Sequence, residues 1–158
     1  MKKCAFIAVL LGLFLNFNIW ASMITFYIIE TGLPESSNIN QYSSDWEDAF
    51  LDVFFDAGYI VSNAPIFRMS TIPAGNILQS VDINVAEARN WGIDYIFITF
   101  LDYSSGMYYP EEIKFYIYNS ATNENILERQ IQGRVTGTAR DESGNIRAFI
   151  RGLIPYIR

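Results

Sequence analysis

The segment from Ile93 to Leu101 constrains the fold of this chain more than any other feature. It is nearly continuous in Ile, Tyr, Phe and Thr, and only Asp94 interrupts the run. A strand with one wet face alternates apolar and polar residues, whereas a near-continuous apolar strand has both faces covered. We therefore expect this segment at the centre of a sheet, with further structure packed on each side.

The remaining elements alternate between strand and helix. Apolar runs bounded by turn residues predict strands, and apolar residues three and four apart predict helices. The predicted strands cover 24–29, 59–62, 93–101, 113–118 and 126–135, and the predicted helices cover 44–57, 82–91 and 146–157. Segment 63–79 is irregular, with a short extended piece at 66–69. The chain therefore predicts an α+β (α/β-like) fold, a single mixed sheet of about five strands with two to three helices packed on it, in the order β-α-β-α-β-β-β-α.

Two helices carry signals at their ends. Ser44, followed by Glu47, has the form of a capping box, so we expect the first helix to start there, and Gly58 ends it. Pro155 should distort the final turn of the last helix, because its ring lacks an N–H donor and clashes with the preceding turn.

The last two strands should form a hairpin around segment 119–125. In the first of them, Ile113, Phe115 and Ile117 share one face, and Lys114, Tyr116 and Tyr118 share the other. In the second, Leu127 and Ile131 oppose Glu128, Gln130 and Gln132. This alternation predicts that one side of the hairpin is in water.

The amino-terminal segment predicts export from the cytoplasm. Lys2 and Lys3 precede an apolar run from Cys4 to Trp20, interrupted by Asn16 and Asn18. The run is shorter than the roughly 20 residues that span a bilayer comfortably, so we interpret residues 1–22 as a Sec-type signal peptide and residues 23–158 as a single envelope domain. Cleavage is expected after Ala21 or Ser22. The alternative is an uncleaved leader, which would be the protein's only membrane attachment.

Removal of the leader limits the available chemistry. Cys4 is the only cysteine and precedes the apolar run, so it is no lipid acceptor, and the mature chain has no thiol. The sequence has no histidine, which excludes the usual general base and the commonest metal ligand. Without Lys2 and Lys3 the chain has nine basic against 17 acidic residues, a net charge of −8. Such a charge disfavours nucleic-acid binding.

The order of elements resembles a known group of envelope domains. The resemblance rests on the helix from Asp45 to Gly58 and its following strand, on segment 88–98, where Asn90-Trp91-Gly92 precedes Asp94 and an apolar strand, and on hairpin 115–129. These features are similar to the small α/β domain at the amino-terminal end of the TolB translocation protein, shared in outline by CsgG, LpoB and FlgO. The resemblance implies a binding or assembly module of the cell envelope. It transfers no catalytic residue, because the group has no shared catalytic set.

Carboxylates supply the only candidate catalytic groups. Glu30 and Asp102 each lie near the carboxyl end of a predicted strand, where α/β sheets place their sites. A glycosidase needs only two such acids, although loop-end carboxylates are also common without catalysis. Asp48, Asp52 and Asp56 recur on one side of the first helix, where they form either a cation site or, as we favour, a solvated flank. Arg147, Arg151 and Arg158 on the last helix could neutralise that flank.

Two groups of residues are candidates for partner binding. Leu51 and Phe55 point away from the apolar stripe of the first helix, so either the last helix or a loop covers them, or they contact a partner. The loop from Asp102 to Glu112 carries Tyr103, Met107, Tyr108 and Tyr109. Aromatic loop tips are typical of protein interfaces, and the alternative is that these tyrosines fold back over the sheet.

The leading hypothesis is a non-enzymatic periplasmic or secreted envelope protein. It would act as a protein-binding or assembly module whose partners are envelope proteins, peptidoglycan-associated ones included. We predict no cofactor, no metal site and no catalytic residue, and the oligomeric state stays open. The alternatives are a carboxylate-dependent hydrolase acting on envelope glycans and a small-ligand carrier, which would need an enclosed apolar pocket.

Overall fold

Two parallel strands form the middle of the sheet in the computed structural model, which describes residues 21–34, 37–104, 106, 108–133 and 141–157. They are β1 (Met23–Thr31) and β4 (Ile93–Asp102), paired from Met23 opposite Ile93 to Thr31 opposite Asp102. Nearly all of β4 is buried, as its continuous apolar composition predicts. The central position of this strand is therefore confirmed.

The other four strands flank this pair. The sheet has the order β2-β1-β4-β5-β6, and β3 (Phe67–Met69) pairs with the second half of β1, beyond β2 (Ile60–Asn63). β5 (Glu112–Asn119) and β6 (Asn125–Gln132) are antiparallel to their neighbours and form the predicted hairpin. The described part of the chain thus forms one mixed sheet of six strands with four helices, which confirms the α+β prediction. β3 is the expected short extended piece.

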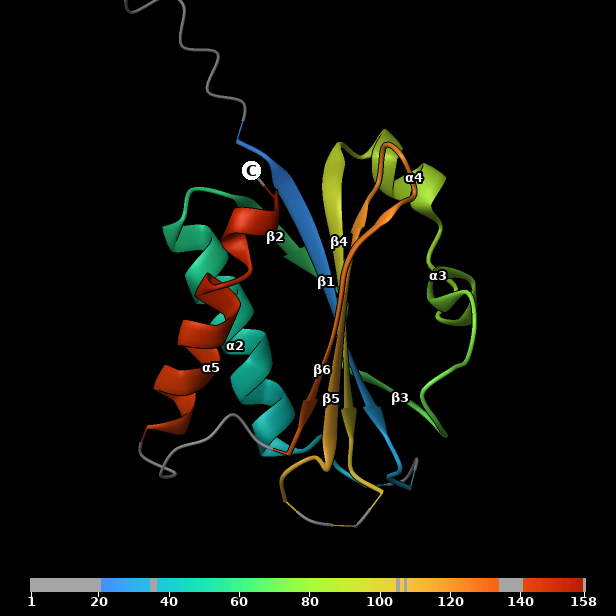
Figure 1. The fold of residues 1–158 in the computed structure, drawn as a ribbon, viewed down its shortest axis with the longest axis vertical. Coiled ribbons are helices and arrows are strands. Elements are labelled where there is room, and N and C mark those ends of the chain that lie inside the picture. Colours follow the sequence, from blue (N-terminus) through green and yellow to red (C-terminus); the bar gives the residue numbers. More distant parts are fainter. Residues whose placement is uncertain (1–20, 35–36, 105, 107, 134–140, 158) are drawn as a thin grey trace, which may run out of the picture.

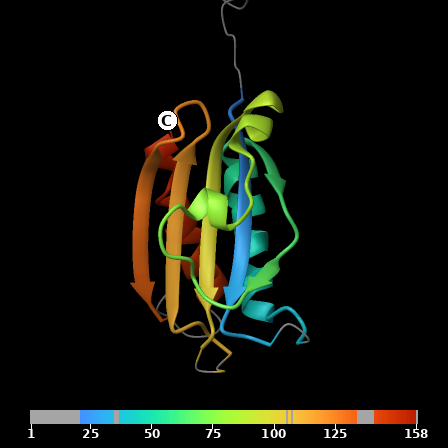
Figure 2. The ribbon, with the colours of Figure 1, turned by 90° about the vertical axis from the view of Figure 1, so that its right-hand side faces the viewer.

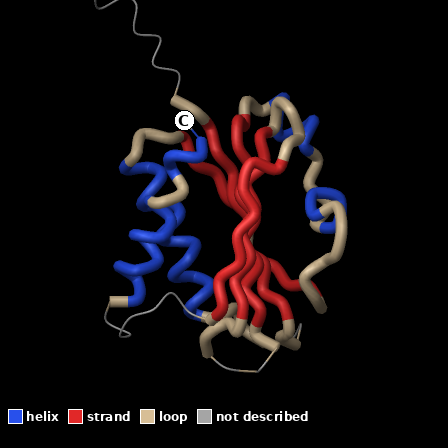
Figure 3. The backbone as a smooth tube through the Cα atoms, in the orientation of Figure 1, coloured by secondary structure: helices blue, strands red, loops and turns tan. Residues whose placement is uncertain are grey.

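The two long helices cover one face of the sheet, here called the first face (Figures 1 and 3). They are α2 (Gln41–Asp56) and α5 (Glu142–Arg151), and α5 is followed by the 3-10 helix η1 (Ile154–Ile157). Trp46 lies at the centre of this core, with its ring 5.2 Å from that of Phe115 and 5.8 Å from that of Phe149. The helices therefore hold the larger of two cores, built largely from aromatic side chains.

Short elements cover the opposite, second face (Figure 2). They are β3, α3 (Ile77–Ser80), α4 (Val85–Asn90) and the loops between them. Tyr116 and Tyr118 of β5 are buried on this face, so the prediction that they lie on a wet side is wrong. Alternation could not reveal this, because tyrosine is mostly apolar and packs like a core residue once another segment covers it. On β6, Glu128, Gln130 and Gln132 are exposed as expected.

Three predicted helix boundaries need correction. α2 begins at Gln41 because Asn40 caps it, accepting a hydrogen bond from the backbone N–H of Tyr42 at 2.9 Å, so the predicted start at Ser44 is wrong. Asparagine is as good an N-cap as serine, which explains why the helix can begin earlier than Ser44. The helix expected over 82–91 is confined to α4, and α3 was not predicted. The last α-helix ends at Arg151. The chain then forms the separate 3-10 helix η1 around Pro155, which agrees with the expected distortion.

The predicted signal peptide lies almost wholly outside the described residues, which begin at Ala21. No helix in the described ranges has both the length and the apolar character to cross a bilayer.

Candidate protein-contact surfaces

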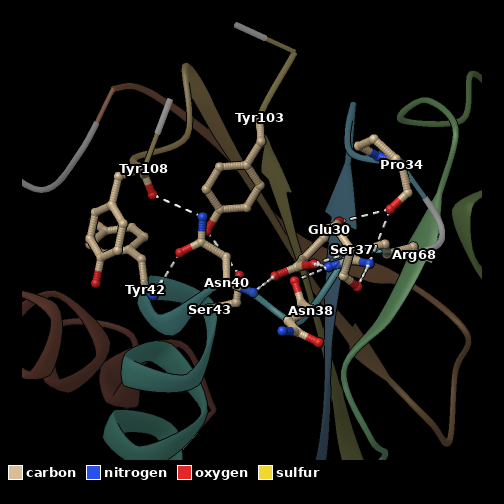
Figure 4. A network of polar contacts seen from close by, with 10 residues as sticks. All are labelled: Glu30, Pro34, Ser37, Asn38, Asn40, Tyr42, Ser43, Arg68, Tyr103 and Tyr108. Carbon is tan, nitrogen blue, oxygen red and sulfur yellow. Dashed lines mark hydrogen bonds and ion pairs between the residues drawn. The ribbon is translucent and has the colours of Figure 1, made fainter. Parts of the chain in front are cut away.

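Glu30 lies at the end of β1 with its side chain fully buried on the first face (Figure 4). Its Oε2 accepts hydrogen bonds from Arg68, at 2.7 Å from Nη2 and 2.8 Å from Nε. Its Oε1 accepts from the backbone N–H of Asn40 at 2.7 Å. Both carboxylate oxygens are thus engaged in joining β1, β3 and the start of α2.

Asp102 stabilises the turn that follows β4 rather than the Glu30–Arg68 pair. Its Oδ1 accepts hydrogen bonds from the Thr31 hydroxyl at 3.1 Å and from the backbone N–H and hydroxyl of Ser104. Because Asp102 pairs with Thr31, the residue after Glu30, the carboxylates of Glu30 and Asp102 point to opposite faces of the sheet. The structure therefore does not bring these two acids together at one site.

Arg68 is a central residue that no pattern in the sequence identified. Besides Glu30, its guanidinium donates hydrogen bonds to the backbone carbonyls of Pro34, Ser37 and Asn38 (Figure 4). A planar fork with five donors suits such a fixed arrangement better than a lysine does. A lone arginine within a short strand was the only signal, and it did not identify the partners.

Tyr103 is not a contact residue in this structure. Its ring is wholly buried and its hydroxyl lies 2.9 Å from Oγ of Ser43 on α2. Burial, the largest cause, raises the pKa of this phenol well above its usual value of 10.0, although the hydrogen bond to Ser43 acts in the opposite direction. The prediction that Tyr103 faces a partner is corrected, because the ring folds back under the loop. Met107 lies outside the described residues.

Tyr108 is exposed, whereas its neighbour Tyr109 packs inward. The side chain of Tyr108 is 51% exposed, and its backbone carbonyl accepts a hydrogen bond from Nδ2 of Asn40 at 3.0 Å. The Tyr109 ring packs edge-on against Tyr42 at 5.2 Å, at the margin of the first-face core. Of these two tyrosines, only Tyr108 presents its ring at the tip of the loop.

A groove lies between the end of α2 and the start of β2. It has a volume of about 410 Å³, and its lining consists of Leu51, Asp52, Phe55, Asp56, Tyr59, Ile60 and Val61. Phe55 is 74% exposed and Ile60 is 52% exposed, while Leu51 packs partly against the core. The alternative that a helix or loop covers these residues therefore holds in part for Leu51 and not for Phe55. We call this feature the Phe55 groove.

One acidic residue of the groove is neutralised by the last helix. Oδ2 of Asp52 lies 2.7 Å from Nη2 of Arg147, so the expected pairing between the acidic flank of α2 and the arginines of α5 is confirmed for this pair. Arg158 lies outside the described residues. In the described ranges, no group of three acidic or thiol side chains is placed to hold a metal ion.

The two candidate surfaces lie at opposite ends of α2. Asn40, which caps the start of the helix, contacts the Tyr108 loop, whereas Phe55 lies in its last turn. Fifteen residues at about 1.5 Å each separate them by roughly 22 Å along the helix axis. The two groups of candidate residues therefore belong to two separate surfaces.

Several solved structures have a similar fold. A PelC dodecamer variant from Paraburkholderia phytofirmans is 10% identical, with 87% of this chain and 90% of that chain covered and a TM-score of 0.51. TolB from Acinetobacter baumannii is 13% identical, with coverages of 87% and 27% and a TM-score of 0.45. The LpoB C-terminal domain from Salmonella enterica is 12% identical, with coverages of 77% and 90% and a TM-score of 0.41. Of these, the likeness to PelC shows a shared fold, and structures of TolB and LpoB are found alongside it.

Sequence comparison gives two results. No curated protein matches this chain. A family model described as "Uncharacterised protein" matches residues 31–127, which is more than half of the 158 residues. The chain therefore belongs to this family.

Proposed function

We propose that this protein is a non-enzymatic binding module of the cell envelope that docks another protein through the Phe55 groove. The observation that carries the proposal is the exposure of Phe55 and Ile60 side by side in one groove. Exposed apolar side chains that gather in a hollow are typical of protein-contact sites, whereas single scattered ones are not. The Tyr108 tip, at the other end of α2, would be a second and independent contact.

The position of the groove supports a docking role. β2 has only four residues and lies at the edge of the sheet, with Ile60 and Val61 in the groove lining. An incoming segment could contact the Phe55 ring and the free edge of β2 at the same time, as extended peptides do at sheet edges. PelC, which shares the fold, was solved as a dodecamer, and this supports a role in assembly.

The chemistry of the chain supports a binding role over catalysis. The sequence has no histidine, its only cysteine is Cys4 in the predicted leader, and Glu30 and Asp102 face opposite sides of the sheet. A hydrolase that uses a carboxylate pair needs both acids on one bond. The proposed location follows from the predicted leader at residues 1–22, and an intact mass of the exported protein would test its cleavage.

The proposal can be tested by co-purification from envelope extract. The Phe55→Ser, Ile60→Thr double variant should lose a partner that the unchanged protein retains, because it removes the apolar contact while leaving the buried core intact. Tyr108→Ala tests the second surface, at the other end of α2. Partners are identified by mass spectrometry, and thermal unfolding verifies that each variant is folded.

The two variants separate the two surfaces. Loss of a partner only in the Phe55→Ser, Ile60→Thr variant assigns docking to the groove, and loss only in Tyr108→Ala assigns it to the loop tip. Equal recovery of all partners by every variant would remove both surfaces from the proposal. Tyr109 is left unchanged, because its ring packs on Tyr42 and its loss would change stability as well.

A further inference from the structure

A second groove lies on the other face of the sheet, where the short elements leave part of β1 uncovered. Its volume is about 370 Å³, within the range of small-ligand sites. β1 forms the floor, segment 62–64 forms one wall and segment 82–91 forms the other. The lining residues are Met23, Thr25, Tyr27, Ser62, Asn63, Ala64, Asp82, Ile83, Asn84, Glu87, Ala88, Trp91 and Ile93. We call it the Trp91 groove.

The floor of the Trp91 groove offers neutral hydroxyl groups. Thr25 is buried on β1, and Tyr27 lies two residues along the same face of the strand. Burial is the main reason that the pKa of Tyr27 lies above its usual value of 10.0, and the nearby charge of Glu87 raises it further. The phenol therefore stays protonated at neutral pH, and Glu87 lies close enough to act on it.

The wall formed by α4 combines an acid with an exposed aromatic ring. Glu87 and Trp91 are four residues apart, and the backbone N–H of Trp91 donates to the carbonyl of Glu87 at 3.1 Å, so their side chains share one helical face. Trp91 is 68% exposed. Asp82, which is also exposed, adds a second carboxylate to the same wall. An indole ring beside carboxylates can bind a cation, through cation–π and charge attraction together.

No lysine or arginine is among the residues that line this groove. Arg89, the nearest in sequence, is held elsewhere, because its Nε donates to the carbonyl of Ser120 at 2.8 Å. The negative charges of Glu87 and Asp82 are therefore not neutralised by the lining. An opposite charge entering the groove would be attracted by both carboxylates and by the face of the indole.

We propose that the Trp91 groove binds an organic cation, a ligand that carries an alkylammonium or guanidinium group. Its charged head would lie between Glu87, Asp82 and the Trp91 ring, and its carbon chain would lie along Met23, Ala88 and Ile93. The cation comes either from a free amine or from a lysine or arginine of a partner protein. The site is on the opposite face of the sheet from the Phe55 groove and does not depend on it.

The experiment is a titration followed by the indole N–H signals in nitrogen-15 NMR. The probes are 1,5-diaminopentane as a free amine, an acetyl-Gly-Lys-Gly-amide peptide as a model of a partner, and pentanoate as an anion of similar length. The Trp91 signal is identified as the one that is lost in Trp91→Phe. The signal of the buried Trp46 should stay unchanged if the fold is intact. Saturable shifts of the Trp91 signal are expected with the cations and not with pentanoate.

Variants distinguish the site from general attraction to an acidic protein. Glu87→Gln, followed by the Trp91 signal, and Trp91→Ala, followed by isothermal titration calorimetry because it lacks the reporting indole, should each weaken binding of the preferred cation about fivefold. Added salt should weaken it further. Glu124→Gln, an exposed acid outside the groove lining, should have no effect. Tighter binding of the peptide would identify a protein source, and tighter binding of the diamine a small molecule. Equal weakening by Glu124→Gln and Glu87→Gln, or no saturable shift at millimolar concentration, would overturn the proposal.

Discussion

Arg68 of β3 and Glu30 of β1 form an ion pair in which Nη2 and Oε2 are 2.7 Å apart and the side chains are 9% and 0% exposed. The two residues are opposite each other in the parallel β1–β3 pairing. Because Arg68 also holds the carbonyls of Pro34, Ser37 and Asn38, the pair connects a short edge strand to the loop that precedes α2. The carboxylate that looked most like a catalytic group is therefore a structural one in this fold.

Removal of one partner of this pair should be costly. We expect Arg68→Met to lower the free energy of unfolding by roughly 3–5 kcal/mol, because it leaves the Glu30 carboxylate buried without its counter-charge. The double variant Glu30→Met, Arg68→Met should lose less than Arg68→Met alone. Urea denaturation measures both. Arg147→Met is the control, since its exposed pair with Asp52 should contribute less than about 1 kcal/mol; equal losses in Arg147→Met and Arg68→Met would contradict the expectation.

Gly32 and Gly58 provide a matched pair of glycine substitutions. Both have a positive φ, +75° and +86°, but a Cβ on Gly32 would lie 2.6 Å from the backbone nitrogen of Ser104, while a Cβ on Gly58 would meet nothing within 4 Å. Gly58→Ala should cost about 1–2 kcal/mol from backbone strain alone. Gly32→Ala should cost clearly more, because β1 and the Ser104 turn must move apart. Similar melting temperatures for the two variants would show that the close approach at Gly32 is relaxed in solution.

Thr99 is a site where a substitution should stabilise the protein. It is fully buried on β4, and its Oγ1 has no hydrogen-bond partner in the part of the chain that the structure describes. Valine has nearly the same shape and removes the unpaired hydroxyl, so Thr99→Val should raise the free energy of unfolding by about 1 kcal/mol. Thermal and urea unfolding report this gain. A loss of stability would mean that the hydroxyl has a partner in solution.

The buried tyrosines should make the protein sensitive to high pH. Burial, followed by the charge of Glu128, raises the pKa of Tyr116 from 10.0 to about 12. A folded-state pKa above the unfolded value means that this contribution to stability is complete below pH 10 and is lost as the pH rises toward 12. Tyr116→Phe should therefore flatten the fall in unfolding free energy across this interval. Phenolate absorbance during alkaline titration measures the tyrosine pKa values independently. Ionisation of every tyrosine near the ordinary pKa in the folded protein would contradict the raised pKa of Tyr116.

Local patterns along the chain determined most of the secondary structure. The continuous apolar run of β4 indicated a central strand, and the apolar stripes of α2 and α5 indicated helices that pack on a sheet, because burial imposes a period of two on strands and 3.6 on helices. Pro155 marked the end of regular helix for a steric reason that needs no distant contact. These properties depend only on residues close together in the sequence.

Tertiary structure alone decided where polar and aromatic side chains lie. Tyr103 and Tyr116 are buried because distant segments cover them, and Glu30 became half of an ion pair because β3 brought Arg68 beside it across 38 positions of sequence. The placement of Phe55 and Tyr108 at opposite ends of α2, and the gathering of Tyr27, Glu87 and Trp91 in one groove, likewise followed from strand pairing and helix packing. Polarity patterns specify which residues prefer burial, whereas the partner of each residue is set by which segments the folded chain brings together.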